Sequence, residues 1–469
     1  MITTSFHNKV IDALELLIKA GSCFQGMFPS FMTLNDFQPY YGLPSKLPGQ
    51  RGCDRAAFGS NLMHDHIVLR LCYELARILD KPALADGADG YLEYFATKCT
   101  ATPTGLFPWG EHAYWNIVEN APGNAWTHTE WGPRRHPLHH DHLRQAPLWL
   151  WEKLWQFNPE CVKRFAAGLD NHWERDRPDG RVTFNRHAYI NEWESYVSTS
   201  QTADFGFPRH AGFYIFDWSF VFGKTCDPEM RARIVRMLDH HWAQRNTQGL
   251  LPMHGRWNVR QTLSLAVSLF ESAKLVEPAD CKLAELMRER ARVYADGFLT
   301  AQDELANGRL VANLPLAAET QKTSLSVALN RDNSGEGGGG SSALLCCGAY
   351  RLTGDQRFLD VGIRAARYFE ENIPENTDDI CPRECGMALG VYCDLAELTG
   401  DVELWRTAAE KVVEIALKRV WDNCLPRAHS SVDYYESQTM PGRLLYSAAR
   451  AAFVFGKGES ELPEDYTQR

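Results

Sequence analysis

Apolar residues recur at spacings of three and four along most of this chain, in paired runs that a short polar turn separates. The segments 67–95, 343–369 and 386–416 show the pattern most clearly, with the turns LDKP, LTGD and LTGD. This spacing is typical of amphipathic helices, and the Pro, Gly and Asp of the turns interrupt them. Each segment therefore predicts a helical hairpin.

Looser copies of the pattern occupy 147–173, 214–242 and 262–298. An N-terminal helix within 1–24 and a last helix at 441–455 remain without sequence neighbours, and together they would make a seventh pair. Hairpins of this kind cannot bury both faces alone, so they pack side by side. We expect an all-α fold, with residues 1–469 as a single (α/α) toroid domain of six to seven hairpins. An open superhelix is the alternative, but its repeats would be shorter.

In a toroid, the inner helices line a bowl and the long connections gather at one rim. Binding groups usually lie on such connections, because the rigid scaffold holds them in place. We therefore expect the functional residues on the long rim connections, which are 43–66, 98–146, 174–213, 249–260 and 320–342.

The composition restricts the partners of the protein. Hydrophobic residues make up 44% and charged residues 23%, as in a soluble globular protein. The formal net charge of −10 argues against nucleic acid, and no apolar run of membrane-spanning length occurs. Arginines and histidines in the rim connections would still give a cleft the local positive charge that an acidic sugar requires.

The N-terminal run lacks the uninterrupted apolar core of a signal peptide, because Asp12 and Glu15 lie within it. The thirteen cysteines are scattered and form no paired CxxC motif. Such a pattern is typical of free thiols in a reducing compartment. We therefore expect a cytoplasmic protein.

The connection 98–146 contains six of the sixteen histidines. One histidine alone is usually structural, but six together favour a metal site. Imidazole nitrogens and carboxylate oxygens suit manganese, zinc or iron, and a site open to substrate needs about three protein ligands. The residues in question are His112, His128, Glu130, His136, His139, His140, Asp141 and His142. Three stretches suggest one ligand each, namely His112 in WGEH, Asp141 in HHDHLRQAP and His187 in FNRH.

These three stretches resemble, in the same order, the motifs of the family 2 polysaccharide lyases, which are pectate lyases built on an (α/α)7 barrel. The resemblance covers short motifs within roughly residues 50–215. It implies that His112, Asp141 and His187 hold a divalent metal, with Mn²⁺ first and Zn²⁺, Fe²⁺ or Ca²⁺ as alternatives. It also implies that Arg186 is the catalytic base. The acidic ligand of that family is typically glutamate, so Glu130 and Glu111 are alternatives to Asp141.

Elimination chemistry agrees with a metal and an arginine in one site. Cleavage of a uronate begins with loss of the proton next to the carboxylate, and a cation on that carboxylate stabilises the developing charge. An arginine, with a reference pKa above about 12, acts as the base only where adjacent positive charge favours its neutral form. His210, Tyr189 and Tyr114 are the alternative bases.

Substrate contacts are predicted on the same connections. Trp109, Trp115, Trp126 and Trp131 lie outside helical periodicity, which favours sugar-stacking platforms over core positions. Arginines there are either substrate contacts or surface ion pairs. The predicted contacts are Trp109, Tyr114, Asn61, His64, Arg135, Arg209 and Arg331, with Tyr434, Tyr435 and Arg443 near the last helix.

The sequence therefore predicts an enzyme, a metal-dependent lyase that cleaves pectate-like, uronic-acid-containing oligosaccharides or polysaccharides. The first alternative is a glycoside hydrolase on the same toroid, acting on unsaturated uronyl oligosaccharides. It would pair Glu111 or Asp65 with Asp141 or Asp204 as acid and base. A sugar epimerase with paired histidines and a non-catalytic carbohydrate-binding or scaffold protein are further alternatives.

Overall fold

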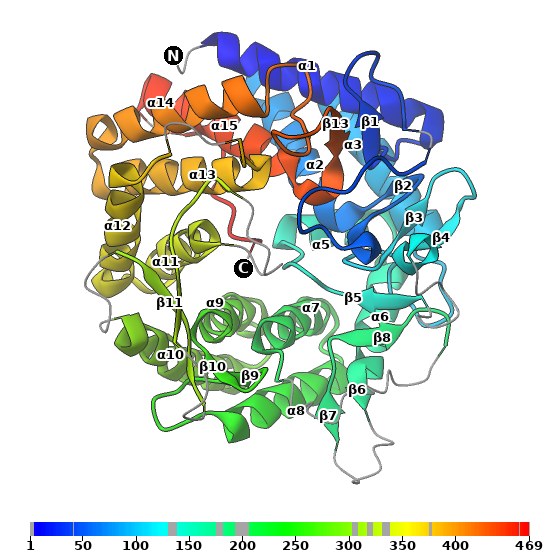
Figure 1. Ribbon diagram of the computed structural model, residues 1–469. Helices are drawn as coiled ribbons and strands as arrows, with labels where there is room; N and C mark the ends of the chain where they lie inside the picture. Colours follow the sequence, from blue (N-terminus) through cyan, green and yellow to red (C-terminus); the bar gives the residue numbers. More distant parts are fainter. Residues whose placement is uncertain are drawn as a thin grey trace.

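Antiparallel helix pairs make up most of the structure (Figure 1). The computed structural model describes residues 4–40, 42–129, 138–174, 182–192, 206–302, 308–316, 322–330, 338–374, 378–458 and 460–468. Every predicted hairpin is present. The helices are α1 (Thr4–Gly21), α2 (Leu62–Leu79), α3 (Pro82–Tyr94), α5 (Leu148–Phe157), α6 (Pro159–Gly168), α7 (Pro208–Thr225), α8 (Pro228–Gln244), α9 (Val259–Val276), α10 (Cys281–Gln302), α11 (Gly339–Thr353), α12 (Gln356–Glu371), α13 (Pro382–Thr399), α14 (Val402–Arg419) and α15 (Pro441–Lys457).

The first helix of most pairs lies on the inside of the ring. α7 is buried from Pro208 through Phe222 without interruption, whereas α12 buries only the stripe that begins with Phe358 and Leu359. A helix that is apolar on one stripe faces solvent on its other side, and one buried all round is internal. The inner helices α7, α9, α11, α13 and α15 follow one another by direct contact.

The ring closes through the two helices without a sequence neighbour. α1 packs against α15, where the rings of His7 and Phe453 lie 4.5 Å apart. α15 in turn contacts α2, the inner helix of the first hairpin. The predicted all-α toroid is therefore confirmed, with α1 and α15 as its seventh pair, and the open superhelix is excluded.

Short strands occupy the connections, a feature that the apolar pattern does not predict. They form small antiparallel ladders in the order β1–β13, β12–β11–β10–β9, β2–β3–β4, β5–β8 and β6–β7. Their bounds are β1 (Phe31–Thr33), β2 (Gly59–Ser60), β3 (Ala113–Asn116), β4 (Ala121–Asn124), β5 (His139–Asp141), β6 (Trp173–Glu174), β7 (Thr183–Phe184), β8 (His187–Tyr189), β9 (Pro252–Met253), β10 (Arg256–Asn258), β11 (Leu310–Pro315), β12 (Thr323–Leu325) and β13 (Tyr434–Glu436).

The segment 460–468 runs into the centre of the ring (Figure 1). Asp465 accepts hydrogen bonds from Arg443 of α15 at 2.6 Å and from Arg70 of α2 at 3.2 Å. Further along, the Gln468 side chain accepts a hydrogen bond from Arg144 Nε at 2.7 Å. The segment thus joins α2, α15 and the start of α5 from within.

None of the helices in the described part of the chain combines the length and the apolar character that a membrane-spanning segment requires.

We predict that Asp465→Ala lowers the free energy of unfolding by about 3–5 kcal/mol, because it leaves buried arginines without their counter-charge. The side chains of Arg443 and Asp465 are 2% and 0% exposed. Asp433→Ala is the control, since Asp433 is 70% exposed and lies 2.8 Å from Arg427. It should cost less than about 1 kcal/mol. Urea unfolding measures both, and equal losses would contradict the buried position of the segment.

Candidate functional site

The pairing of β5 with β8 brings two distant stretches of the chain together. Asp141 lies opposite His187, and His139 lies opposite Tyr189. Residues opposite each other on antiparallel strands point to the same face of the ladder. These four side chains therefore share one face, and His140 points to the other.

The third stretch joins through Gly110, which forms a parallel bridge with Asp141. Gly110 has a φ of 104°, and a Cβ there would lie 1.8 Å from the Asp141 carbonyl oxygen. Only glycine allows this approach. The bridge places Glu111 and His112 beside β5.

Asn61 holds the same turn from the N-terminus of α2. Its side-chain nitrogen donates to the Gly110 carbonyl at 2.8 Å, and its oxygen accepts from the Met63 and Gly110 amides. The amide is thus engaged by backbone groups. The substrate contact predicted for Asn61 is therefore replaced by a role in positioning the turn.

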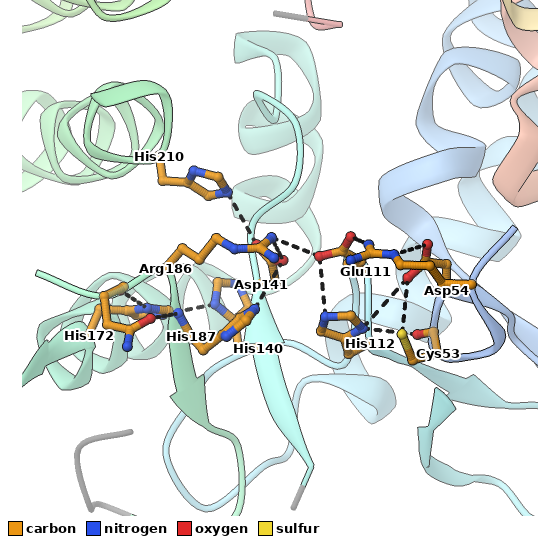
Figure 2. A network of polar contacts seen from close by, with 12 residues as sticks. Cys53, Asp54, Glu111, His112, His140, Asp141, His172, Arg186, His187 and His210 are labelled. Atoms are coloured by element: carbon orange, nitrogen blue, oxygen red, sulfur yellow. Dashed lines mark hydrogen bonds and ion pairs between the residues drawn. The ribbon is translucent and has the colours of Figure 1, made fainter. Parts of the chain in front are cut away.

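Glu111, His112, Asp141 and His187 each offer a ligand atom, and these atoms lie within 4.8 Å of one another (Figure 2). His139 forms a second such group with His112 and His187. The structure thus brings together all three predicted metal ligands. It adds Glu111, which the sequence left as an alternative to Asp141.

The orientation of His112 is fixed by a neighbouring loop. Its Nδ1 lies 2.9 Å from the Cys53 carbonyl oxygen, so Nδ1 carries the proton that is donated. Nε2, the other ring nitrogen, lies 3.2 Å from Glu111 Oε2 and would carry the lone pair in the neutral form of the ring. This is the arrangement of a metal-ligating histidine, whose other nitrogen binds a carbonyl group.

Arg186 lies between the two carboxylates of the cluster. One of its terminal nitrogens, Nη1, donates to Glu111 Oε2 at 2.7 Å and also to Asp141 Oδ2. The other oxygen of Glu111 pairs with Arg51. In this structure the guanidinium of the predicted base therefore contacts two carboxylates.

The protonation states around Asp141 suit a cation. Burial would raise the pKa of Asp141, but Arg186 and hydrogen bonds from His187 and His210 hold this pKa well below its usual value. Burial lowers the pKa of His187 and of His210 to about 3. The nitrogens nearest to the carboxylate lie 3.5 Å and 3.3 Å away, respectively. At neutral pH the site thus combines an ionised carboxylate with neutral imidazoles, the forms that bind metals.

A chain of buried hydrogen bonds supports β8 from the other face of the ladder. Trp109 Nε1 lies 3.0 Å from His140 Nε2, His140 Nδ1 lies 3.0 Å from His172 Nε2, and His172 Nδ1 lies 3.0 Å from the Asn185 carbonyl oxygen. An indole N–H can only donate and a carbonyl oxygen can only accept, so each proton in the chain points toward Asn185. Burial lowers the pKa of His140 well below its usual value and the pKa of His172 to about 3. This series of hydrogen bonds between neutral rings fixes the backbone position of Asn185, the residue before Arg186.

Two predicted sugar contacts belong to the core. Trp109 is 0% exposed and is enclosed by aromatic rings. Tyr114 is 2% exposed, and its ring fills the space where a Cβ on Gly59 or Gly123 would lie. Neither ring has a free face for a sugar, which corrects both predictions. Trp126 is partly exposed, and its ring lies 5.2 Å from that of His112.

The remaining predicted residues separate into three groups. Tyr189 lies on the ligand face of β8, His64 borders a small cavity next to Glu111, and Arg209 is buried beside His210. Tyr434, Tyr435 and Arg443 are buried, and Tyr434 and Arg443 bond to Ser45 and Asp465. Outside the described residues lie Glu130, Trp131, Arg135, His136, Asp204 and Arg331.

His139 was among the clustered histidines of the connection 98–146, but sequence reasoning did not choose it as one of the three ligands. The signal was present, because His139 and Asp141 are two residues apart and would share a face in a strand. No strand was expected there, so the spacing was not used. Arg51, Cys53 and Asp54 lie in the connection 43–66, which was expected to carry functional residues, but no motif there singled them out.

No protein-family model and no curated protein matches the chain. Solved structures with a similar course of helices include a sugar epimerase from a ruminal bacterium, with 12% identity and a TM-score of 0.48 over 81% of this chain and 89% of that one. An unsaturated glucuronyl hydrolase specific for heparin has 9% identity and a TM-score of 0.45, covering 98% and 99%. An α-1,6-mannanase of Salegentibacter sp. HEL1_6 has 9% identity and a TM-score of 0.43, covering 95% and 98%.

We predict that Gly110→Ala lowers the free energy of unfolding by about 3 kcal/mol or more, because its Cβ collides with the backbone of Asp141. Gly400→Ala is the control. Gly400 also has a positive φ, of 71°, but a Cβ there meets nothing within 4 Å. It should cost about 1–2 kcal/mol. Chemical unfolding compares the two variants, and similar losses would show that the bridge tolerates a side chain.

The buried Asp65 should make the stability of the fold depend on pH. It accepts hydrogen bonds from Tyr91 at 3.0 Å and Ser60 at 3.3 Å, yet burial raises its pKa from 3.8 to about 7. Because the pKa in the folded protein is the higher one, this group's stabilisation is complete below about pH 4 and is lost as pH rises through 7. Asp65→Asn should remove that loss. Its stability relative to wild type should rise by up to about 4 kcal/mol between pH 4 and pH 7.

Unfolding curves at several pH values test this, with the exposed Asp433→Asn as the control. A constant difference between Asp65→Asn and wild type would contradict the raised pKa.

Proposed function

We propose that this chain is a carbohydrate-active enzyme that cleaves uronic-acid-containing glycans by metal-dependent β-elimination. The observation that carries the proposal is the convergence of Glu111, His112, Asp141 and His187 beside Arg186. Three separate stretches supply these residues, and they are the stretches whose order resembles the family 2 polysaccharide lyases.

The donor set fits a divalent metal. Two imidazole nitrogens and two carboxylate oxygens suit manganese, zinc or iron better than calcium, which prefers oxygen alone. Glu111 Oε2 and the lone pair of His112 Nε2 face each other at 3.2 Å. Two such acceptors repel each other unless a proton or a cation lies between them. When bound, the metal would polarise the substrate carboxylate and stabilise the charge that develops on it.

In the proposed reaction, a base removes the proton at C5 of the uronate. The C4–O bond breaks, a C4=C5 double bond forms, and the leaving oxygen takes up a proton. Arg186 is the proposed base, and it must first lose its proton. Its present contacts with Glu111 and Asp141 oppose that loss. Occupation of the same oxygens by a metal would remove the opposition, because the carboxylate charge would then be neutralised.

His210 is the alternative base. It is neutral at the pH of the cell because burial lowers its pKa to about 3, and its Nε2 lies 3.3 Å from Asp141 Oδ1. After it gains a proton, the imidazolium of His210 would form an ion pair with the Asp141 carboxylate. Tyr189, on the ligand face of β8, is the third candidate.

A glycoside hydrolase is the second candidate function, because two carboxylates, Glu111 and Asp141, contact one nitrogen of Arg186. Such a hydrolase needs one of the two protonated as the general acid. The low pKa of Asp141 keeps that carboxylate ionised, and Glu111 pairs with Arg51 and Arg186. Sugar epimerisation by the neutral pair His187 and His210 would leave the glycan chain uncut.

We predict opposite effects of two substitutions on metal affinity. His187→Ala removes a ligand and should weaken Mn²⁺ binding by about 100-fold or more. Arg186→Ala removes a cation from the same oxygens, so Mn²⁺ should bind more tightly, while lyase turnover falls by about 100-fold or more. His128→Ala is the control, since His128 is exposed in the same connection and lies outside the cluster.

Electron paramagnetic resonance of Mn²⁺ measures binding, and ultraviolet absorbance of the unsaturated product on polygalacturonate and its oligomers measures elimination. Reducing sugar released without this absorbance would favour the hydrolase. An inverted sugar configuration in a glycan of unchanged length would favour the epimerase. Absence of Mn²⁺ binding by wild type and Arg186→Ala would overturn the metal site.

A further inference from the structure

A small cavity of about 70 Å³ adjoins the candidate metal cluster at Glu111. Its other charged lining side chains are Arg51, Asp54, Arg144 and Arg383, and His64 also lines it. Arg51 pairs with Asp54 at 2.9 Å and Arg383 pairs with Glu384 at 2.5 Å. The volume exceeds that of a single water, so the cavity has room for a small polar group. A larger cavity of about 970 Å³, lined by Trp149 and other residues, lies elsewhere in the ring and contains none of the ligand cluster.

Arg144 is the distinctive residue of the small cavity. It is 3% exposed, and its hydrogen bonds go to the Gln468 amide oxygen at 2.7 Å and to His64 Nδ1 at 3.2 Å. Burial and Arg144 itself hold the pKa of His64 well below its usual value, so both partners are neutral. Among the side chains that the structure describes, no carboxylate forms an ion pair with Arg144.

The surroundings add positive charge. Burial lowers the pKa of Arg144 well below its usual value, the nearby Arg383, Arg209 and Arg443 lower it further, and Asp141 offsets these effects only in part. The reference pKa of arginine lies above about 12, so Arg144 still has to carry its positive charge inside the protein unless a specific contact removes the proton. A buried guanidinium beside other cations is costly unless an anion compensates it.

We infer that this cavity binds the carboxylate of an acidic sugar residue, with Arg144 as the principal contact and Arg383 and His64 beside it. A planar carboxylate matches the paired N–H groups of a guanidinium. The inference rests on the proposed function for the identity of the sugar, and it adds a subsite next to the cluster. A neutral sugar would leave the charge of Arg144 uncompensated, so the subsite selects acidic glycans.

Two substitutions test the subsite by different routes. Arg144→Gln removes the cation. Gln468→Glu keeps the arginine and places a carboxylate 2.7 Å from its Nε, where it would compete with the ligand's charge. Gln468→Glu should fold at least as stably as wild type, because it gives Arg144 a counter-charge. It therefore tests the subsite even if Arg144→Gln does not fold.

Binding is measured by calorimetry in EDTA, with oligogalacturonate, the neutral galactose oligomer of equal length, and inorganic sulfate. We expect either substitution to weaken oligogalacturonate binding about 10- to 100-fold, the loss of one charged hydrogen bond or two. Binding of the neutral oligomer should not change. Arg357→Gln is the control, because Arg357 is 60% exposed and pairs with Asp355 and Asp296.

Unchanged oligogalacturonate affinity in both variants would overturn the subsite, as would sulfate binding as tight as that of the sugar acid. Because EDTA removes the metal, this result does not depend on elimination. Loss of acidic-ligand binding in the variants, together with no unsaturated product from wild type, would support the subsite while the proposed reaction fails.

Discussion

The candidate site depends on the backbone pairing of β5 with β8 and on the bridge between Gly110 and Asp141. Together, these two pairings place His112 near His187, although they are more than seventy positions apart in the sequence. The register of the main-chain hydrogen bonds fixes which residues lie opposite each other. The toroid positions the strands only indirectly, through the helices that precede and follow them. The ring therefore supplies rigidity, while the ladder decides which side chains meet.

The same arrangement creates an electrostatic conflict. Glu111 and Asp141 are close enough to share one guanidinium nitrogen, and two carboxylates at that separation require a cation between or beside them. Arg186 meets this need in the structure, and a divalent metal would meet it with more charge. A bound metal would need the same carboxylate oxygens that Arg186 contacts. The metal and Arg186 would therefore compete for Glu111 and Asp141.

The helical architecture was predictable because it follows from local periodicity. Each hairpin has an apolar stripe and a turn, and both can be recognised in a single sequence. The inner helices begin several residues earlier than their apolar pattern indicates. α7 starts at Pro208 and α13 at Pro382, ahead of predicted hairpins that start at 214 and 386. Their first turns contain Arg209, His210 and Arg383, polar residues that resemble loop sequence.

The site was predictable only in part. His112, Asp141 and His187 were selected from motifs, and the structure brings them together. The exposure of individual loop residues did not follow from the sequence. Trp109 and Tyr114 fall outside helical periodicity, yet both are buried by contacts between separate connections, which a single sequence does not specify. The central segment 460–468 was missed for the same reason, since its partners are charged residues on distant helices.

The position of the arginines explains how an acidic chain can present a basic site. The net charge of −10 belongs to the whole sequence, whereas Arg209 and Arg443 lie in the first turns of inner helices, and Arg144 lies four residues before α5. Helix N-termini also carry partial positive charge, so the arginines and the helix dipoles add in one region. Asp465 neutralises Arg443 but leaves Arg144 with the neutral Gln468. The central segment thus supplies a carboxylate to Arg443 but only a neutral amide to Arg144.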